Sequence, residues 1–426
     1  GIPKDVAVLV QAEIKEIQQS TWKIQIELNV FLRQNYKIIK NLESSYELEQ
    51  KSGEIKKNVA CTKEFFYLAG WIPKSFMERL NKLLMSFDNR ILLITKDPNE
   101  RTNSVINPPT MLINNEVFKP FESMVLMYGV PSYGEIDPTI FFGVTYTLMF
   151  GAMFGDVGQG LVLLLAGFLL KNKDGRINLG GVFETLGISS IVFGFLYGSV
   201  FGSEYVINAL LIRPMEHIND ILIAAIIFGC GFLILGFILG ITNSIRKKDI
   251  ERGLFGKEGI AGFMFYVGVL ILLVSIVYKT PLLPTAIWMI YFIFFLLLIL
   301  LKHPLANILL GKEILFEEGV KDYFIESSFE VIETLLSMFS NTLSFIRVGA
   351  FALNHVGLFI AFSSMAAMTK SGFTSVMILI LGNIIIICLE GLIVFIQGLR
   401  LEYYELFSKY YEGSGVTFEP VRVKLK

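Results

Sequence analysis

Long apolar runs dominate the chain from residue 139 onwards, and short polar segments separate them. A helix needs about 20 apolar residues to cross the hydrocarbon core of a bilayer. The runs of this length are residues 182–202, 221–245, 260–278, 281–301, 348–369 and 373–399. Glu184 and Glu390 are the only Asp, Glu, Lys or Arg residues within them, so the pattern predicts transmembrane helices.

The apolar stretch over residues 139–170 is too long for one crossing and contains a single acid, Asp156. Its middle reads GAMFGDVGQG, and glycines beside an acid are poor material for a helix interior. The stretch therefore predicts two short spans joined by a tight hairpin. The predicted fold class is mainly α: a polytopic membrane protein with about eight transmembrane helices.

The last two predicted helices are unusually long. Residues 327–367 and 373–411 each run near forty residues, and upright helices of that length would protrude far beyond a bilayer of about 30 Å. We therefore expect both to be tilted, and to lie side by side with a concave face between them.

Basic residues gather in alternate loops. The loops after the second, fourth and sixth predicted spans hold Lys171, Lys173 and Arg176, then Arg246, Lys247, Lys248, Arg252 and Lys257, then Lys302, Lys312 and Lys321. The intervening loops hold one basic residue each: Arg213, Lys279 and Lys370. Because basic loops stay in the cytoplasm, the pattern places both termini there. The Ile- and Lys-rich composition suggests a bacterial plasma membrane.

The first 138 residues are rich in Lys and Glu and predict a cytoplasmic domain. Apolar residues recur at helical intervals over residues 4–52, and Gly53 is expected to end this helix. The helix either packs on its own domain or forms one strand of an antiparallel coiled coil. In the second case its partner lies upstream, and the full protein begins roughly 200 residues earlier.

A small α/β lobe is predicted over residues 60–100. It consists of a strand that ends in the turn 70–73, a helix over 74–85 and a strand over 91–95. A linker, residues 101–138, leads to the membrane domain at 139–411, and residues 412–426 form a cytoplasmic tail.

Composition excludes several functions. The chain is 53 % hydrophobic and 18 % charged, with a net charge of −1, so a nucleic-acid surface is not expected. Cys61, Cys230 and Cys388 are far apart and indicate neither a disulfide framework nor a metal site. The Gly-Lys pairs at Gly256 and Gly311 are followed by Glu, so no Walker A motif is present. We predict no catalytic residue, no bound metal and no cofactor.

Two arginines lie in apolar helices, Arg347 and Arg400. Arginine keeps its charge, and placing it within a bilayer costs from about 3 to more than 10 kcal/mol. Arg400 could reach the interface from the end of the last span. For Arg347 that explanation is weak, because apolar residues and only His355 follow it for over twenty positions.

Carboxylates accompany both arginines. Glu333 lies fourteen residues before Arg347, and Glu390 lies ten before Arg400. The two helices thus present these polar residues: Glu333 and His355 on the first, and Glu390, Gln397, Glu402 and Glu405 on the second. Glutamates near helix ends could simply be solvated, but Glu390 lies well inside its run. A permanent cation between two sets of acids is suited to ion exchange with a moving carboxylate, with the acids lining two half-channels.

Several motifs spread along the chain make this pattern specific. They read PPT, YGVPSYGEIDP, LMFGAMFGDVGQG, GFLYGSVFGSE and finally LEG…LRL…E…SKYYEGSG…FEP. Together they resemble the V/A-type rotary ATPase subunit a/I family over nearly all of residues 108–420. The turn 70–73, Gly-Trp-Ile-Pro, is similar to the end of that family's soluble domain.

The resemblance implies that Arg347 and Arg400 are the paired arginines at a rotor interface. Glu333, His355, Glu390 and Glu405 occupy family positions, whereas Glu402 stands where many relatives have His and adds an oxygen ligand suited to Na⁺. The implied transported ion is H⁺ or Na⁺, coupled to ATP hydrolysis or synthesis. The implied partners are the bilayer, a rotor ring of small hydrophobic hairpin subunits (c/K), peripheral-stalk subunits (E/G type) and a central-stalk adaptor (d/C type).

Two other functions would also account for parts of this pattern. A secondary ion transporter also places charges in a membrane bundle, but such proteins tend to show inverted repeats, and none is visible here. A purely structural scaffold would explain the soluble helix and lobe but leaves Arg347 without a role.

Overall fold

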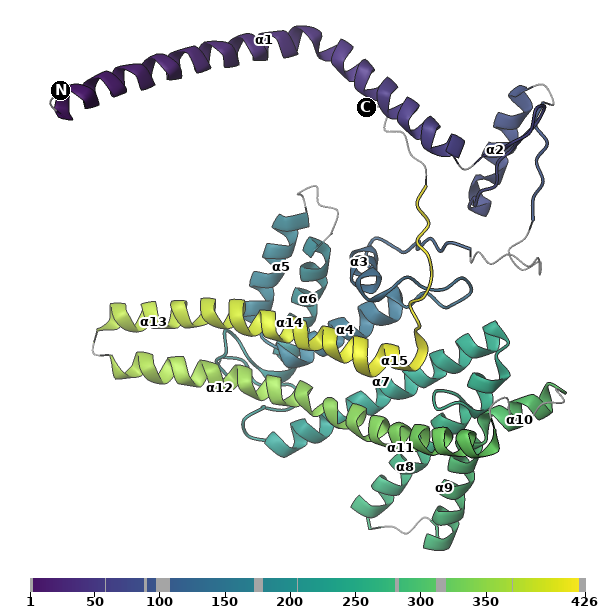
Figure 1. Ribbon diagram of the computed structural model, residues 1–426. Helices are drawn as coiled ribbons and strands as arrows, with labels where there is room; N and C mark the ends of the chain where they lie inside the picture. The colour runs from purple at the N-terminus through teal and green to yellow at the C-terminus, as the bar shows by residue number, and fades with distance from the viewer. Residues whose placement is uncertain are drawn as a thin grey trace. The chain divides into compact units, whose positions relative to one another are not determined.

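The computed structural model (Figure 1) describes residues 3–57, 59–87, 90–96, 108–171, 179–204, 206–279, 283–311, 319–369 and 371–420. The chain divides into two compact units, Gly1–Arg101 with Phe418–Lys426, and Thr102–Thr417. Several basic loop residues that set the predicted orientation lie outside the described residues, namely Lys173, Arg176, Lys312 and Lys370. Parts of the predicted lobe, linker and tail also lie outside them: residues 97–100, 101–107 and 421–426.

The first unit begins with one long helix, α1 (Pro3–Lys57). It continues through Gly53, so the predicted break there is wrong: a single glycine costs only about 1 kcal/mol in a helix. A two-stranded antiparallel sheet follows, β1 (Ala60–Cys61) with β2 (Phe66–Tyr67). The predicted helix at 74–85 is confirmed as η1 (Lys74–Phe76), α2 (Met77–Leu84) and η2 (Met85–Phe87). The predicted strand at 91–95 is wrong: this apolar run has no regular structure, and no strand pairs with it among the described residues.

The second unit is helical. Its first helices are α3 (Lys119–Tyr128), α4 (Thr139–Met153), α5 (Val157–Lys171), α6 (Leu179–Tyr197) and α7 (Ile218–Lys247). The turn η3 (Glu251–Phe255) leads to α8 (Ile260–Val277), α9 (Thr285–Leu300) and α10 (Lys302–Leu309). The last helices are α11 (Val320–Ser344), α12 (Ile346–Met368), α13 (Gly372–Ile385), η4 (Ile386–Glu390), α14 (Gly391–Arg400), η5 (Leu401–Leu406) and α15 (Phe407–Tyr410).

Each predicted span contains a helix, although residues 198–202, 283–284 and 154–156 within them are not helical, and this confirms a polytopic helical membrane protein. Within the described residues, five helices are long and apolar enough to cross a membrane. The number rises to six if α9 and α10, which meet at a bend of 71°, form one broken span. The remaining two of the eight predicted spans are α4 and α5, which have 15 residues each and fall short of a full crossing.

The predicted interruption near Asp156 is present, but α4 and α5 do not form a tight hairpin with each other. Instead α5 runs antiparallel along α6, and these two helices make the most extensive helix pair of the unit. Glycines allow the close approach: a Cβ on Gly187 would lie 2.6 Å from the backbone nitrogen of Leu164, and one on Gly167 would lie 2.5 Å from that of Glu184. Small residues at such contacts are typical of helix packing in membranes.

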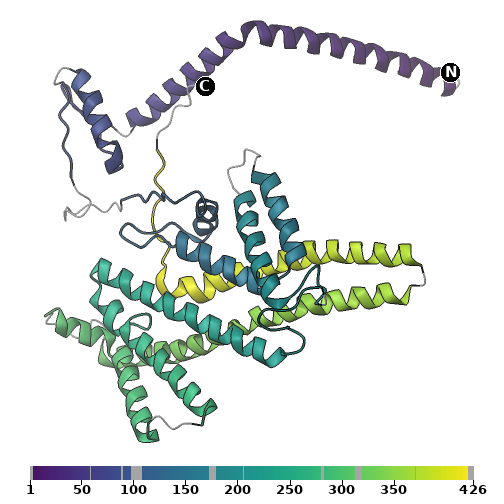
Figure 2. The same cartoon turned by 180° about the vertical axis from the view of Figure 1, so that it is seen from behind.

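Two long stretches dominate the unit, Val320–Met368 with 49 residues and Gly372–Tyr410 with 39 residues. They lie side by side, joined at the turn between α12 and α13 (Figure 1). Seen from behind (Figure 2), α7 crosses the pair, and it contacts α12, α11 and α15.

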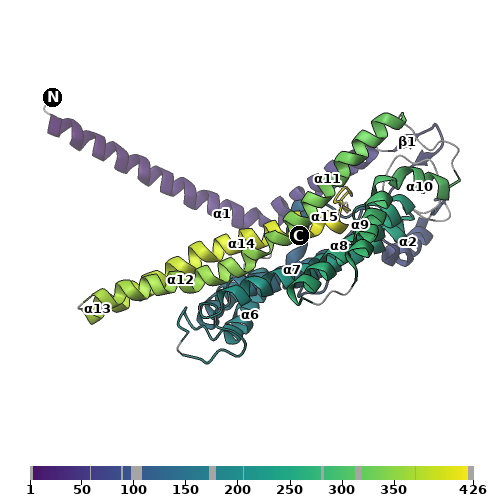
Figure 3. The ribbon, with the colours of Figure 1, turned by 90° about the horizontal axis from the view of Figure 1, so that it is seen from below.

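The view from below (Figure 3) shows the long helices along one side of the unit and α6 to α9 along the other. Apolar side chains on the long pair remain exposed, among them Leu336 at 65 %, Phe339 at 67 % and Leu392 at 57 %. The core lies on the covered side, where Phe142 and Tyr146 of α4 stack at 5.4 Å and Phe142 also packs on Phe407 at 5.6 Å. The long pair therefore has one packed face and one face free for lipid or another protein.

Candidate functional site

The first long stretch is interrupted at Phe345, two residues before Arg347. The ring of Phe345 is fully buried against α7, where Gly229 provides the space. A Cβ on Gly229 would lie 2.1 Å from Cγ of Phe345. This contact between a ring and a glycine lies at the break, one residue before α12 begins at Ile346 and two before Arg347.

Replacing Gly229 with Ala should therefore destabilise the protein by about 1–3 kcal/mol, because the ring must move. Thermal unfolding of the purified protein measures the effect. Gly231→Ala is the matched control, since a Cβ there meets nothing within 4 Å. Equal stability of the two variants would show that Gly229 does not seat the ring.

The second long stretch is irregular at its charged residues. It contains two π turns, η4, which ends at Glu390, and η5, which begins directly after Arg400. Such turns in α-helices are frequent at functional sites. Next to Arg400, Gly398 packs on the ring of Tyr146, whose hydroxyl donates to the carbonyl oxygen of Phe395 at 3.0 Å. Helix α4 therefore holds the second arginine in place.

Arg347 and Arg400 lie close enough to interact electrostatically, and Glu405 interacts with both. Arg400 is exposed, whereas Arg347 is half-buried and its Nη1 has no hydrogen-bond partner among the described residues. Glu405 is 5 % exposed and also interacts with Ser344 of α11. The two predicted arginines thus share one cluster with a single buried acid.

A polar stripe leads along α11 toward this cluster. Glu333, Ser337, Asn341 and Ser344 follow one another at helical spacing, and Asn341 Nδ2 donates to Ser337 Oγ at 3.4 Å. A polar cavity of about 130 Å³ opens at the start of the stripe. Its lining residues are Lys257, Glu258, Glu333, Thr334, Ser337, Ser408 and Lys409. Glu333 itself is exposed and forms an ion pair with Lys257 at 3.4 Å.

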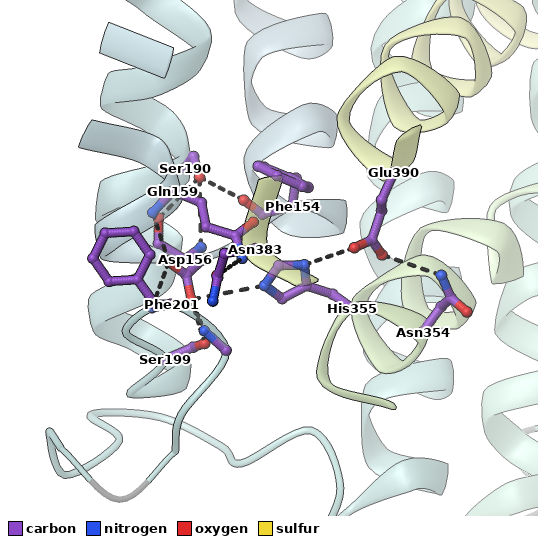
Figure 4. Close-up of polar contacts among 11 residues, drawn as sticks. Phe154, Asp156, Gln159, Ser190, Ser199, Phe201, Asn354, His355, Asn383 and Glu390 are labelled. Carbon is purple, nitrogen blue, oxygen red and sulfur yellow. Dashed lines mark hydrogen bonds and ion pairs between the residues drawn. The ribbon is translucent and has the colours of Figure 1, made fainter. Parts of the chain in front are cut away.

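A buried polar cluster lies further along α12 (Figure 4). His355 points between two carboxylates: its Nδ1 is 2.9 Å from Glu390 Oε2, and its Nε2 is 3.7 Å from Asp156 Oδ2. Asn354 Nδ2 donates to the other oxygen of Glu390 at 3.2 Å. His355 and Glu390 are each 2 % exposed, so Glu390 is not a solvated residue at a helix end.

Asp156 is fully buried at the corner between α4 and α5. Its carboxylate accepts hydrogen bonds from Gln159 N at 2.8 Å, Ser199 Oγ at 2.7 Å, Phe201 N at 2.9 Å and Gly202 N at 2.6 Å. The bond to Gln159 caps the start of α5, which explains why the helix begins there. Phe201 has a φ of 49°, a strained value for a bulky residue, and this conformation turns two amides toward the carboxylate.

Sequence reasoning treated Asp156 only as a helix breaker. The signal that could have identified it is the one applied to Glu390: a single acid in a long uncharged run. Gln159 and Asn383 were also missed; they bridge α5 and α13 through a 3.0 Å hydrogen bond beside the cluster. Polar amides in otherwise apolar helices would have indicated them.

A network of ion pairs holds the segment that follows α15 against the end of α7 and the residues after it. Lys247 Nζ lies 2.8 Å from Glu135 and 2.9 Å from Glu412, and Arg252 also pairs with Glu412. The hydrogen bond from Lys247, with Arg252 nearby, holds the pKa of Glu412 below its ordinary value of 4.5. The network therefore fixes the end of the long stretch that carries Arg400.

Two further predicted site residues, Gln397 and Glu402, belong to neither the polar cavity nor the buried cluster on α12. Gln397 is half-buried on α14 with Oε1 unpartnered among the described residues, and Glu402 is fully buried against Thr145 of α4. No group of three or more His, Cys, Asp or Glu residues that could hold a metal ion occurs in the part of the chain that the structure describes.

Fold and site together define a polytopic helical membrane protein whose two longest candidate membrane spans carry a paired-arginine cluster. Residues 5–206 and 311–423 match the V-type ATPase 116kDa subunit family. The match covers more than half of the chain, and the chain belongs to this family.

Several curated proteins are similar in sequence to most of this chain. The A-type ATP synthase subunit I of Saccharolobus solfataricus is 28 % identical over 93 % of this chain and 65 % of the relative. The proteins of the same name from Pyrococcus horikoshii and Methanocaldococcus jannaschii are 24 % and 26 % identical, over 100 % and 99 % of this chain and 64 % of each relative. The chain thus spans just under two thirds of the length of these relatives.

Proposed function

We propose that this chain is the membrane-embedded stator subunit of a rotary ATPase and that it carries two ion half-channels beside a rotor ring. The observation that carries the proposal is the arginine cluster. Arg347 and Arg400 come from adjacent long helices and interact at a point between two separate polar regions. One region is the cavity with its stripe on α11, and the other is the Asp156–His355–Glu390 cluster.

The order along the first long stretch supports two half-channels rather than one pore. Glu333 precedes Arg347 by fourteen residues, about 21 Å of helix, and His355 follows it by eight, about 12 Å. A permanent cation between the two regions repels a cation moving directly from one to the other. An ion would instead enter one region, bind a carboxylate on the ring, and leave through the other region after the ring turns.

The exposed face of the long helix pair is where the ring would pass. Arg400 is exposed on that pair together with apolar side chains such as Ile396 at 51 % and Leu392 at 57 %. A ring of small hydrophobic hairpin subunits would offer matching apolar surface and a carboxylate for the arginine. The basic segment that ends at Lys257 also lines the cavity, so the cavity would open to the cytoplasm.

Cysteine accessibility tests this arrangement in sealed vesicles that contain the intact complex, with Cys61, Cys230 and Cys388 replaced. A charged, membrane-impermeant thiol reagent should label Ser337→Cys only from the cytoplasmic side. It should label Asn383→Cys, beside the buried cluster, only from the opposite side. Leu336→Cys, on the exposed apolar face, is the control and should stay unlabelled. Labelling of both polar positions from the same side would rule out two half-channels.

We further propose that α1 is part of the stator arm and pairs with an upstream helix of the full protein. Its apolar side chains are exposed in this chain, for example Ile17 at 60 %, Leu28 at 53 % and Phe31 at 58 %. An amphipathic helix gains most of its stability by packing that stripe. The greater length of the curated relatives is consistent with such a partner. Peripheral-stalk subunits would hold the arm, and a central-stalk adaptor would join ring and rotor.

Deleting residues 4–52 should leave the membrane spans inserted but release ATP hydrolysis from ion movement, because the stator would no longer resist torque. The measurement is the number of ions pumped per ATP in proteoliposomes. Alanine at Glu16 and Lys23, on the charged side of α1, is the control and should leave coupling intact. Normal coupling without the arm would contradict the stator role of this helix.

A further inference from the structure

Glu402 is a predicted half-channel residue that belongs to neither the polar cavity nor the buried cluster on α12. It lies in the π turn η5 and is 0 % exposed. Its neighbours are Thr145 and Tyr146 on α4, and Tyr403, Glu405 and Tyr410 on its own stretch. Neither carboxylate oxygen has a hydrogen-bond partner among the described residues.

None of the surrounding hydroxyl groups donates to Glu402. Tyr146 donates to the Phe395 carbonyl at 3.0 Å, and Tyr403 donates to the Met124 carbonyl at 2.7 Å. Thr145 lies beside the carboxylate, but its proton is directed at the Phe141 carbonyl oxygen, 2.7 Å away. The Tyr410 hydroxyl is buried and unpartnered among the described residues, and it lies within electrostatic reach only.

Among the described residues, no cationic side chain acts on Glu402 either. The charged group that influences it is Glu405, which is itself balanced by Arg347 and Arg400. An ionised carboxylate that is buried without a donor or a counter-ion costs several kcal/mol. A neutral carboxylic acid at the same place has a proton to donate. Thr145 Oγ1 can accept it, since a hydroxyl that donates elsewhere keeps lone pairs free.

We propose that Glu402 holds a proton and donates it to Thr145 Oγ1, which continues the chain to the Phe141 carbonyl oxygen. The hydrogen-bonded chain ties the π turn to α4. Because Arg400 precedes this turn and Glu405 lies within it, Glu402 is a positioning residue for both. This inference does not depend on whether the chain transports ions.

Infrared spectroscopy of the full protein in lipid at neutral pH tests the proposal, because protonated carboxyl groups have a carbonyl stretch distinct from ionised ones. The difference spectrum of wild type minus Glu402→Gln should contain a protonated-carboxyl band. Glu412→Gln is the control: Glu412 is paired with Lys247 and Arg252 and should contribute no such band. Thr145→Val keeps the side-chain shape and should shift the Glu402 band to higher frequency by removing its acceptor.

Three results would overturn the proposal. The first is a Glu402→Gln difference that contains only ionised-carboxylate bands. The second is a protonated band that disappears when Na⁺ replaces choline in the buffer, which would identify a Na⁺ ligand instead. The third is an unshifted band in Thr145→Val, which would deny the hydrogen bond. The Thr145→Val result decides the matter even if Glu402→Gln fails to fold.

Discussion

Replacing Arg347 with glutamine is expected to abolish coupled ion transport while the protein still folds and assembles. Glutamine keeps much of the side-chain length but removes the permanent charge. Arg347 is half-buried, its Nη1 has no hydrogen-bond partner among the described residues, and the internal interaction that the change removes is the one with Glu405. The charge itself is what a ring carboxylate would meet. Removing a preorganised charge of this kind lowers rates by about 100-fold or more.

ATP-driven ion uptake in proteoliposomes that contain the intact complex measures the effect. Arg347→Lys should also be severely impaired, because a desolvated lysine can lose its proton whereas arginine cannot. Arg213→Gln is the control; Arg213 is outside the cluster, in an ion pair with Glu216 at 3.1 Å, and should be tolerated. Coupled transport at the normal rate in Arg347→Gln would contradict the two-half-channel mechanism.

The membrane helices could be predicted because a segment that crosses a bilayer must be apolar, and the residue types alone show whether it is. Apolar runs of sufficient length must form helices, since backbone groups in hydrocarbon have no other partners. Arg347 and Glu390 stood out for the same reason, as charges in segments that exclude charge. Their placement on adjacent helices also followed, because the two longest runs are joined by a very short turn.

The features that long-range contacts determine could not be predicted. Three of the four donors to the Asp156 carboxylate come from Ser199, Phe201 and Gly202, more than forty residues later in the chain. The break at Phe345 depends on a glycine of α7, and nothing near Phe345 in sequence indicates it. The run at 91–95 looked like a strand by composition, but a strand requires a neighbour.

The pairing of α5 with α6 is a contact between two helices, yet the sequence contained a signal for it. Gly160, Gly167, Gly187 and Gly194 all meet backbone of the facing helix at 3.0 Å or less if a Cβ is added. In each helix the two glycines named here are seven residues apart, and this spacing places them on one face of the helix. That spacing was visible in the sequence and would have predicted an α5–α6 pair rather than a hairpin of α4 with α5.

Replacing Asp156 with asparagine should lower the free energy of unfolding by about 3 kcal/mol, although the two side chains have nearly the same shape. Each carboxylate oxygen of Asp156 accepts two hydrogen bonds, from Gln159 N and Phe201 N on one and from Ser199 Oγ and Gly202 N on the other. An amide has one oxygen, so in either orientation its NH₂ group faces a backbone N–H that loses its acceptor.

The same substitution removes one of the two carboxylates that flank His355, so it should disturb the buried cluster as well as the corner between α4 and α5.

Thermal unfolding of the purified protein in lipid or detergent measures the loss. Ser199→Ala removes one donor but leaves the acceptors intact, and should cost only about 1 kcal/mol. Asp220→Asn is the matched control, since that side chain is 62 % exposed and pairs only with His217 across one helical turn. If Asp156→Asn unfolded at the same temperature as Asp220→Asn, the buried carboxylate would not hold this corner together. The strained backbone at Phe201 would then need another source of support.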